Sequence, residues 1–391
     1  MDPIPYSRQS INKDDIDMVI STMNSDFLTQ GPKIRDFENA IEQTLEVKHA
    51  VACSSGSSAL HLAYSAAGIT SQSLGIVPAI TFAATANALR YQGAEVKFCD
   101  VDPKTGLICT DSLEEVIKKI PGSQKEERNL IAPVSFAGRV APLPKCTEIA
   151  KANNFILIED ASHSPGAWVK KDIGEGKYFS ANGEYALAST LSFHPVKHIC
   201  AGEGGAVVTN NSELAEKAAR LRSHGINRPY DDKDEMPWYY EQEDLGWNYR
   251  LTDLQASLGH SQINRLNDFL FQRRRIALRY DELLRKEPFK NHISPPPYED
   301  GHAWHLYIIQ FLEKERRNLA YKFLKERKIF TQIHYIPVYR HPYYQNLIGS
   351  MSLPGAETYF ESCLSIPLYP NLSEHQQDRV LECLALFLEK G

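Results

Sequence analysis

A lysine and an aspartate are the side chains in this sequence best placed to do chemistry on a bound small molecule. Lys197 ends the run Ser192 to Lys197 and precedes Gly202-Glu203-Gly204-Gly205. An amine of this kind can hold an aldehyde cofactor as a Schiff base, but an isolated lysine is usually just exposed. Asp160 ends the apolar run Ile158-Glu159-Asp160-Ala161. Because ligands in open α/β sheets bind beyond the carboxyl ends of the strands, Asp160 can serve a metal, a ribose or a protonated ring nitrogen, or simply cap a loop.

Two further segments offer partners for such a ligand. Ser55-Gly56-Ser57-Ser58 follows a short apolar run and precedes a helical pattern. Backbone N–H groups at a helix N-terminus attract an anion, although serines also cap helices that bind nothing. An aromatic tract runs from Ile333 through His334, Tyr335 and Ile336 to Tyr344. Taken alone, such a tract is more often packing than a ligand site.

Together these segments supply what a pyridoxal 5'-phosphate (PLP) site needs: a phosphate cradle, an acid for the pyridine nitrogen, an aromatic face and a lysine. Phe82, just after another apolar run, offers the aromatic face. A dinucleotide site would need G-x-G-x-x-G after the first strand, and that spacing is missing. No cysteine or histidine spacing suggests a metal site.

The elements that position these residues alternate between apolar runs and helical patterns over the first two-thirds of the chain. We expect strands at 51–53, 75–78, 96–99, 130–134, 155–158 and 205–209, and helices at 143–152 and 212–221. This alternation predicts an α/β fold whose mostly parallel sheet has helices on both faces. One long helix is expected over 252–284, then a strand over 305–311 and helices over 316–328 and 372–388. We therefore predict a large domain, 1–251, and a smaller C-terminal α+β domain, 252–391.

Composition narrows the functional classes. The chain has 391 residues and a formal net charge of -6, with no dense basic stripe, so no nucleic-acid partner is expected. No apolar stretch approaches the ~20 residues that span a bilayer, and the N-terminus lacks the pattern of a secretory signal. The seven scattered cysteines suit reduced thiols. We expect a cytoplasmic enzyme without a membrane partner.

The sequence resembles the DegT/DnrJ/EryC1/StrS family of sugar aminotransferases, which have the fold-type-I PLP architecture. The matching segments are Ser55 to Leu60, Thr81 to Asn87, Glu159 to His163, Ser192 to Lys197 with Gly202 to Gly205, and Gly246 to Arg250. Within the family, four segments resemble the enzymes of pseudaminic acid biosynthesis: Ile4 to Ile11, Ser25 to Pro32, Ser192 to His198 and His334 to Pro337. The resemblance implies transfer of the amino group of L-glutamate to C4 of a UDP-linked 4-keto-6-deoxy-N-acetyl sugar, giving UDP-4-amino-4,6-dideoxy-N-acetyl-β-L-altrosamine. It does not say whether the product feeds flagellin glycosylation or another surface glycan.

The same resemblance assigns roles to individual positions. Lys197 would bind the cofactor and Asp160 would face its ring nitrogen. Ser57, Ser58 and Ser192 would hold the phosphate, and Asn248 would reach the phosphate of a second subunit, which implies a homodimer with a shared site. Phe82 would stack on one ring face and His163 would cover the other. The sugar nucleotide would lie against Tyr6, Asp26, Phe27, Leu28, Thr29, Ser57, Ser192, Asn248, Ile333, His334, Tyr335 and Ile336.

Two departures and three alternatives accompany this assignment. The family usually has threonine where Ser57 stands, which keeps the hydroxyl, and Lys170 to Tyr185 is longer than usual and is expected to form a modified surface loop. The chain could instead aminate a different nucleotide sugar. A dehydratase of the family is disfavoured, because those members carry histidine where Lys197 stands. A non-catalytic PLP-binding regulator would normally carry a DNA-binding segment, and none is visible.

Overall fold

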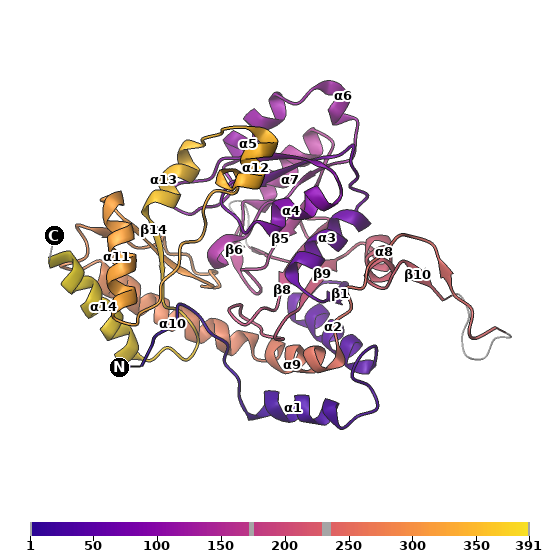
Figure 1. Cartoon of the computed structure of the whole chain (residues 1–391), viewed down its shortest axis with the longest axis horizontal. Coiled ribbons are helices and arrows are strands. Elements are labelled where there is room, and N and C mark those ends of the chain that lie inside the picture. The colour runs from indigo at the N-terminus through magenta and orange to yellow at the C-terminus, as the bar shows by residue number, and fades with distance from the viewer. Residues whose placement is uncertain (1, 172–175, 229–235, 390–391) are drawn as a thin grey trace.

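The computed structural model describes residues 2–171, 176–228 and 236–389, and its centre is a seven-stranded sheet. The strand order is β1 (His49–Cys53), β9 (Gly205–Thr209), β8 (Ala188–Ser192), β5 (Phe155–Asp160), β4 (Asn129–Ile131), β2 (Leu74–Pro78) and β3 (Glu95–Cys99) (Figure 1). Only β9 runs against its neighbours; the other four pairs are parallel. The predicted mostly parallel sheet is confirmed.

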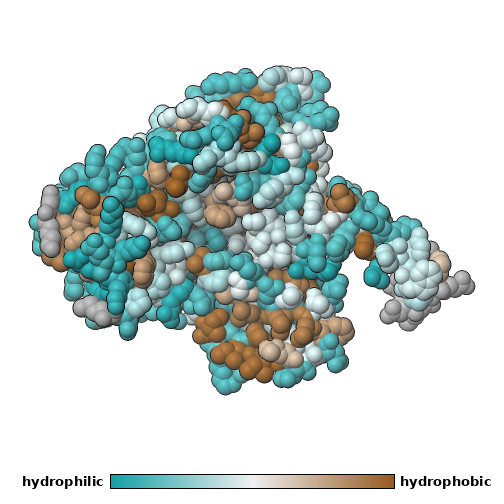
Figure 2. Space-filling view, in the orientation of Figure 1, coloured by the Kyte–Doolittle hydropathy of each residue, from teal (hydrophilic) through white to brown (hydrophobic). Residues whose placement is uncertain are grey.

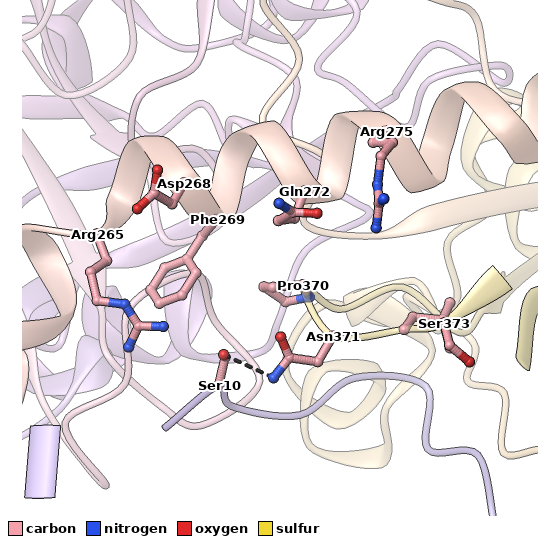
Figure 3. A pocket seen from close by; sticks show the side chains of 10 residues that line it. Ser10, Arg265, Asp268, Phe269, Gln272, Arg275, Pro370, Asn371 and Ser373 are labelled. Atoms are coloured by element: carbon pink, nitrogen blue, oxygen red, sulfur yellow. Dashed lines mark hydrogen bonds between the residues drawn. The ribbon is translucent and has the colours of Figure 1, made fainter. Parts of the chain in front are cut away.

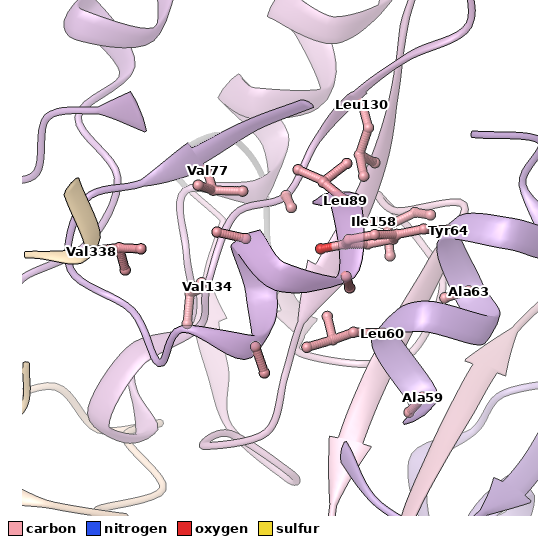
Figure 4. Close-up of a cluster of buried hydrophobic side chains, with 14 of the residues drawn as sticks. Ala59, Leu60, Ala63, Tyr64, Val77, Leu89, Leu130, Val134, Ile158 and Val338 are labelled. Carbon is pink, nitrogen blue, oxygen red and sulfur yellow. The ribbon is translucent and has the colours of Figure 1, made fainter. Parts of the chain in front are cut away.

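Helices cover both faces of this sheet because its strands are buried on both sides. Val51 and Val77 point into one core cluster, which includes residues of three helices: α3 (Gly56–Ala66), α4 (Ala84–Tyr91) and α8 (Ser212–Arg222) (Figure 4). Neighbouring strand residues such as Ala50 and Ile76 point to the opposite face. There they meet α2 (Pro32–Leu45), α5 (Thr110–Lys118), α7 (Leu143–Ala152) and α9 (Asp253–Ile263). This sandwich leaves the carboxyl ends of the parallel strands at one edge.

A second core forms around a three-stranded antiparallel sheet of β12 (Ile293–Ser294), β13 (Tyr307–Phe311) and β14 (Cys363–Ile366). It is covered by α10 (Leu266–Leu284), α11 (Lys314–Glu326) and α14 (Glu374–Glu389). Ile4, from the start of the chain, is buried in this core and bridges to Ile329. The N-terminal segment thus passes between the two cores before α1 (Lys13–Met23), which packs on α9. The domain division after Leu251 stays a prediction.

The remaining elements are short. They are α6 (Gly122–Lys125), α12 (Pro342–Ile348), α13 (Pro354–Ser362), the 3-10 turns η1 (Phe136–Gly138) and η2 (Val338–Arg340), and two hairpins: β6 (Trp168–Lys170) with β7 (Lys177–Phe179), and β10 (Ile226–Asn227) with β11 (Glu241–Gln242). The β10–β11 hairpin projects from the body of the molecule (Figure 1). No helix in the described ranges is long and apolar enough to cross a bilayer.

Three sequence expectations were wrong in detail. The helix expected over 252–284 is two helices, because a turn at Asn264 and Arg265 ends α9 and the Arg265 guanidinium pairs with buried Asp15. The strand expected to reach Val134 ends at Ile131, and Val134 forms only a single bridge to Asp160.

Lys170 to Tyr185 is also more than a surface loop. Residues 172–175 lie outside the described part, but the segment forms a hairpin and then turns inward. There Ser180 and Ala181 are buried and donate hydrogen bonds to the Glu159 carboxylate. Two further donors, the hydroxyls of Ser135 and Ser189, complete the shell of this buried charge. Glu159 is therefore the anchor of this turn.

Candidate active site

Asp160 lies at the carboxyl end of β5, and two hydrogen-bond donors hold its carboxylate. The Thr85 hydroxyl donates to Asp160 Oδ2 at 2.7 Å, and the Ser162 N–H donates to Oδ1 at 3.1 Å. Thr85 stands at the start of α4, which follows β2, so the contact joins two strand ends of the sheet. The carboxylate is only 5% exposed. A buried acid with two donors is fixed in orientation and can present its remaining lone pairs to a ligand.

Lys197 stands in the turn between β8 and β9. Its N–H donates to the His194 carbonyl at 2.8 Å, and the Ser7 hydroxyl donates to the adjacent Val196 carbonyl at 3.0 Å. The side chain is partly buried, and burial lowers the pKa of its amine from 10.5 to about 8, while the nearby Asp160 carboxylate raises it. Burial disfavours the charged amine more than one carboxylate can restore. Lys197 therefore carries a far larger neutral fraction near pH 7 than a surface lysine does.

The serine loop lies at the N-terminus of α3 and touches the end of β8. Ser55 caps the helix by accepting from the Ser58 N–H at 3.1 Å, as the capping alternative predicts. Gly56 and Ser57 occupy the first turn, where backbone N–H groups have no intrahelical acceptor. A methyl group at Gly56 would lie 2.8 Å from the Ser192 Cβ, so Ser192 is in contact with this turn. Ser57 is exposed and Ser58 is buried.

Aromatic rings gather beside these groups. Phe82 is 59% exposed, with its ring 6.0 Å from that of Tyr335. The Tyr335 hydroxyl lies 3.4 Å from His163 Nε2. The ring centroids of His334 and Tyr6 are 5.5 Å apart. Burial lowers the pKa of His163 well below its usual value, and the neighbouring Lys197 lowers it further. Within the aromatic tract, His334 and Tyr335 thus belong to the same site as Asp160 and Lys197.

The remaining predicted site residues lie outside this group of contacts. Asn248 is exposed and bridges to Ser223, although the next carbonyl, of Tyr249, accepts from the Ser54 N–H. Asp26 to Thr29 are exposed beside the start of α9. Ile336 is 44% exposed, and Ile333 packs between the two cores. Among the interactions of the described residues, none joins 26–29 or Asn248 to Lys197.

The structure adds site residues to which the sequence assigned no role. Thr85 holds Asp160, and Thr190, paired with Asp160 across β5 and β8, has a buried hydroxyl with no partner in the described ranges. The buried ring of His305 lies against that of His163, and the buried ring of His198 lies against that of His305. Thr85 and His198 lay in segments that carried the family resemblance, whereas the places of Thr190 and His305 depend on strand order and on the second core.

A hollow of about 560 Å³ lies away from this site, between α10 and the turn before α14 (Figure 3). In it the Asn371 side-chain N–H donates to Ser10 Oγ at 3.0 Å, and Arg265, Asp268 and Arg275 line its wall. Neither Lys197 nor Asp160 borders it. We place the chemistry at the strand ends, because the reactive groups are there.

Comparison with known proteins agrees with this geometry. The model of the DegT/DnrJ/EryC1/StrS aminotransferase family matches residues 9–385. The chain belongs to this family. It is 36% identical to a UDP-4-amino-4,6-dideoxy-N-acetyl-beta-L-altrosamine transaminase of Campylobacter jejuni, over 99% of this chain and 98% of that one. It is 34% identical to the spore coat polysaccharide biosynthesis protein SpsC of Bacillus subtilis, over 97% and 96%.

A solved structure extends the likeness to three dimensions. Helicobacter pylori PseC, an aminotransferase involved in the biosynthesis of pseudoaminic acid, superposes with a TM-score of 0.87 at 30% identity and covers all of both chains. The fold-type-I class predicted from the sequence is confirmed, as is PLP as the cofactor. The residues present fit that cofactor. The first turn of α3 offers N–H groups and Thr190 a buried hydroxyl, all without a partner among the described residues, and the site adds a fixed carboxylate and a lysine of lowered pKa. The protein is a PLP-dependent aminotransferase.

Proposed function

We propose that this aminotransferase moves the amino group of L-glutamate to C4 of a UDP-linked 4-keto-6-deoxy-N-acetyl sugar, giving UDP-4-amino-4,6-dideoxy-N-acetyl-β-L-altrosamine for pseudaminic acid biosynthesis. The observation that carries the reaction type is Lys197, an amine of lowered pKa beside a fixed carboxylate. The sugar rests on two relatives, the Campylobacter transaminase and PseC. Tyr6 and His334, in ring contact at the same site, support a sugar subsite there.

Each proposed role follows from where the side chain lies. When bound, PLP supplies an electron-withdrawing ring through which an amino group is exchanged for a keto oxygen. The first turn of α3, with Ser57, Ser58 and Ser192, would bind the phosphate through N–H and hydroxyl donors. Asp160, oriented by Thr85, would keep the ring nitrogen protonated.

The proton-moving group is Lys197. Because its pKa is about 8, the amine can both take and return a proton near neutral pH. Phe82 and His163 would exclude water from the two ring faces. We keep as predictions the sugar-nucleotide contacts of Asp26 to Thr29, Ile333 and Ile336. The cytoplasmic location is likewise a prediction.

Three measurements test this proposal. Lys197→Ala should abolish the visible absorbance of bound cofactor and all turnover, whereas Lys170→Ala, at the exposed end of β6, should change neither. Retained transamination in the first variant would refute the assignment. Product analysis with a panel of UDP-4-keto sugars decides the substrate, and a different preferred sugar would move the protein to another branch of the family. A yellow protein whose colour no amino donor bleaches would instead be the non-catalytic regulator.

We further propose a homodimer whose partner supplies Asn248 to the phosphate. Exposed apolar side chains support a covered face: Ile16, Ile20 and Met23 lie at helical spacing on α1, and Phe27 and Leu28 follow. Figure 2 shows this apolar surface along the edge that α1 occupies in Figure 1. Solvent-exposed patches of this kind usually mark an interface.

Mixing two inactive variants tests the shared site. Lys197→Ala and Asn248→Ala each damage one half of a site, and a mixed dimer would hold one intact site. After unfolding and joint refolding, about one quarter of wild-type activity should return for a twofold-symmetric dimer. No recovery from refolded mixed dimers, or a monomer by light scattering, would contradict the shared site.

A further inference from the structure

A row of buried imidazoles lies behind Lys197. The ring of His163 is 4.3 Å from that of His305, which is 5.5 Å from that of His198. All three residues are at most 4% exposed. His163 follows β5, His198 follows β8 and His305 precedes β13, so the row joins the main sheet to the second core. Residues this buried and this close constrain one another's ring planes.

Hydrogen bonds fix the outer two rings in single tautomers. The Ala137 N–H donates to His163 Nδ1 at 3.3 Å, so the proton of neutral His163 is on Nε2, which faces the Tyr335 hydroxyl. His198 Nε2 lies 2.8 Å from the Ala303 carbonyl and must donate to it. In the described part of the chain, His305 Nδ1 is buried with no partner. His305 is therefore held by ring contacts and by its backbone.

That backbone is anchored by a buried guanidinium. Arg273, with no exposed surface, donates from Nη1 to the carbonyls of Trp304, His305 and Leu368 at 3.1–3.2 Å. Burial, and then the positive charge of neighbouring groups, lowers the pKa values of His198 and His305 well below their usual value. The three imidazoles therefore stay neutral, and the packing around each keeps its ring plane fixed.

We propose that His305 is a positioning residue that holds the ring of His163 in one plane against the face of the cofactor. This inference rests on the cofactor-covering role proposed for His163. The ring of His163 has His305 on one side, while Phe136 and Tyr335 lie 5.7 and 6.2 Å from it. Removing the His305 ring frees space on one side. The imidazole is then held by the Ala137 N–H at 3.3 Å, by the Tyr335 hydroxyl at 3.4 Å and by ring contacts more distant than that of His305, and these fix its plane less closely.

A merely structural role for His305 would lower stability without changing the cofactor. His302 offers a matched control, since it is an equally buried imidazole in the same segment. Its ring stacks on Trp304 at 4.0 Å, and its Nδ1 accepts from the Trp304 N–H. No ring contact in the described part of the chain joins His302 to His163.

The experiment measures the circular dichroism of bound PLP and its dissociation constant for His163→Ala, His305→Ala, His305→Phe and His302→Ala. We expect His305→Ala to change the cofactor dichroism and to weaken PLP binding roughly three- to tenfold, the effect of losing one ring contact. His305→Phe, which keeps a ring, should give both values near wild type. His302→Ala should lower thermal stability alone.

The outcomes distinguish failure of positioning by His305 from failure of the cofactor-covering role proposed for His163. If His163→Ala leaves the dichroism unchanged, the role proposed for His163 fails. If His163→Ala changes the signal and a folded His305→Ala does not, positioning by His305 is refuted. If the alanine variant does not fold, His305→Phe decides, because altered values in that folded variant would show that a ring alone cannot do the positioning.

Discussion

The lowered pKa of Lys197 makes a quantitative prediction about how fast the apoprotein captures its cofactor. Only a neutral amine attacks an aldehyde. With a pKa of about 8, about one Lys197 in ten is neutral at pH 7, against about one in 3,000 for a lysine at 10.5. At equal intrinsic reactivity, this difference alone accelerates capture about 300-fold over a surface lysine at pH 7.

The assay mixes apoprotein with PLP and follows the visible absorbance of bound cofactor between about pH 6 and pH 10. The capture rate should rise with a midpoint near pH 8. Because the Asp160 carboxylate raises the pKa of Lys197, Asp160→Asn should move that midpoint to lower pH. Glu159→Gln is the matched control, since Glu159 is the neighbouring buried carboxylate on the opposite face of the strand, and it should leave the midpoint in place.

Two results would refute this reasoning. A wild-type midpoint near 10.5 would mean that the folded protein leaves the Lys197 amine as solvated as a surface lysine. A higher midpoint in Asp160→Asn would mean that the carboxylate acts on Lys197 through something other than its charge.

Three further predictions concern stability and reactivity. Lys197→Met should raise the free energy of unfolding of the apoprotein at pH 7 by at most about 3 kcal/mol, because burial in the folded state disfavours the charged amine. In denaturant titrations this gain should fade as the pH rises from about 8 to about 10.5, and a gain independent of pH would contradict the prediction. Gly205→Ala should abolish PLP binding or folding, since its Cβ would lie 2.3 Å from the Ser55 carbonyl oxygen, whereas Gly122→Ala, with open space around it, should bind PLP and melt like wild type. Native alkylation at pH 8, read by mass spectrometry, should spare the buried thiols and label the partly exposed ones, because a buried thiol is inaccessible and burial raises its pKa. The buried thiols are Cys53, Cys99, Cys146, Cys200 and Cys363, and the partly exposed ones are Cys109 and Cys383. Modification of the buried set first would contradict the burial pattern.

The sequence and the structure disagree where a segment depends on distant partners. The helix expected over 252–284 breaks at Asn264 because Arg265 turns to meet Asp15, some 250 residues earlier. The segment after Lys170 turns inward because Glu159 needs donors. Periodicity reports which face of a segment is buried, and it carries no information about which remote side chain demands a turn.

The amino-acid sequence alone did not predict β8, the strand before Lys197. It determined the strand that ends at Asp160, the strand over 205–209 that follows Lys197, the serine turn that opens α3, and through them the cofactor class. These are local patterns of burial and small residues, and they persist in any arrangement of the sheet. Only the tertiary structure decided that Thr85 holds Asp160, that burial brings the pKa of Lys197 to about 8, and that the ring of His305 contacts that of His163. Desolvation and ring contact depend on which segments meet in space, and that is set by strand order and by the packing of the two cores.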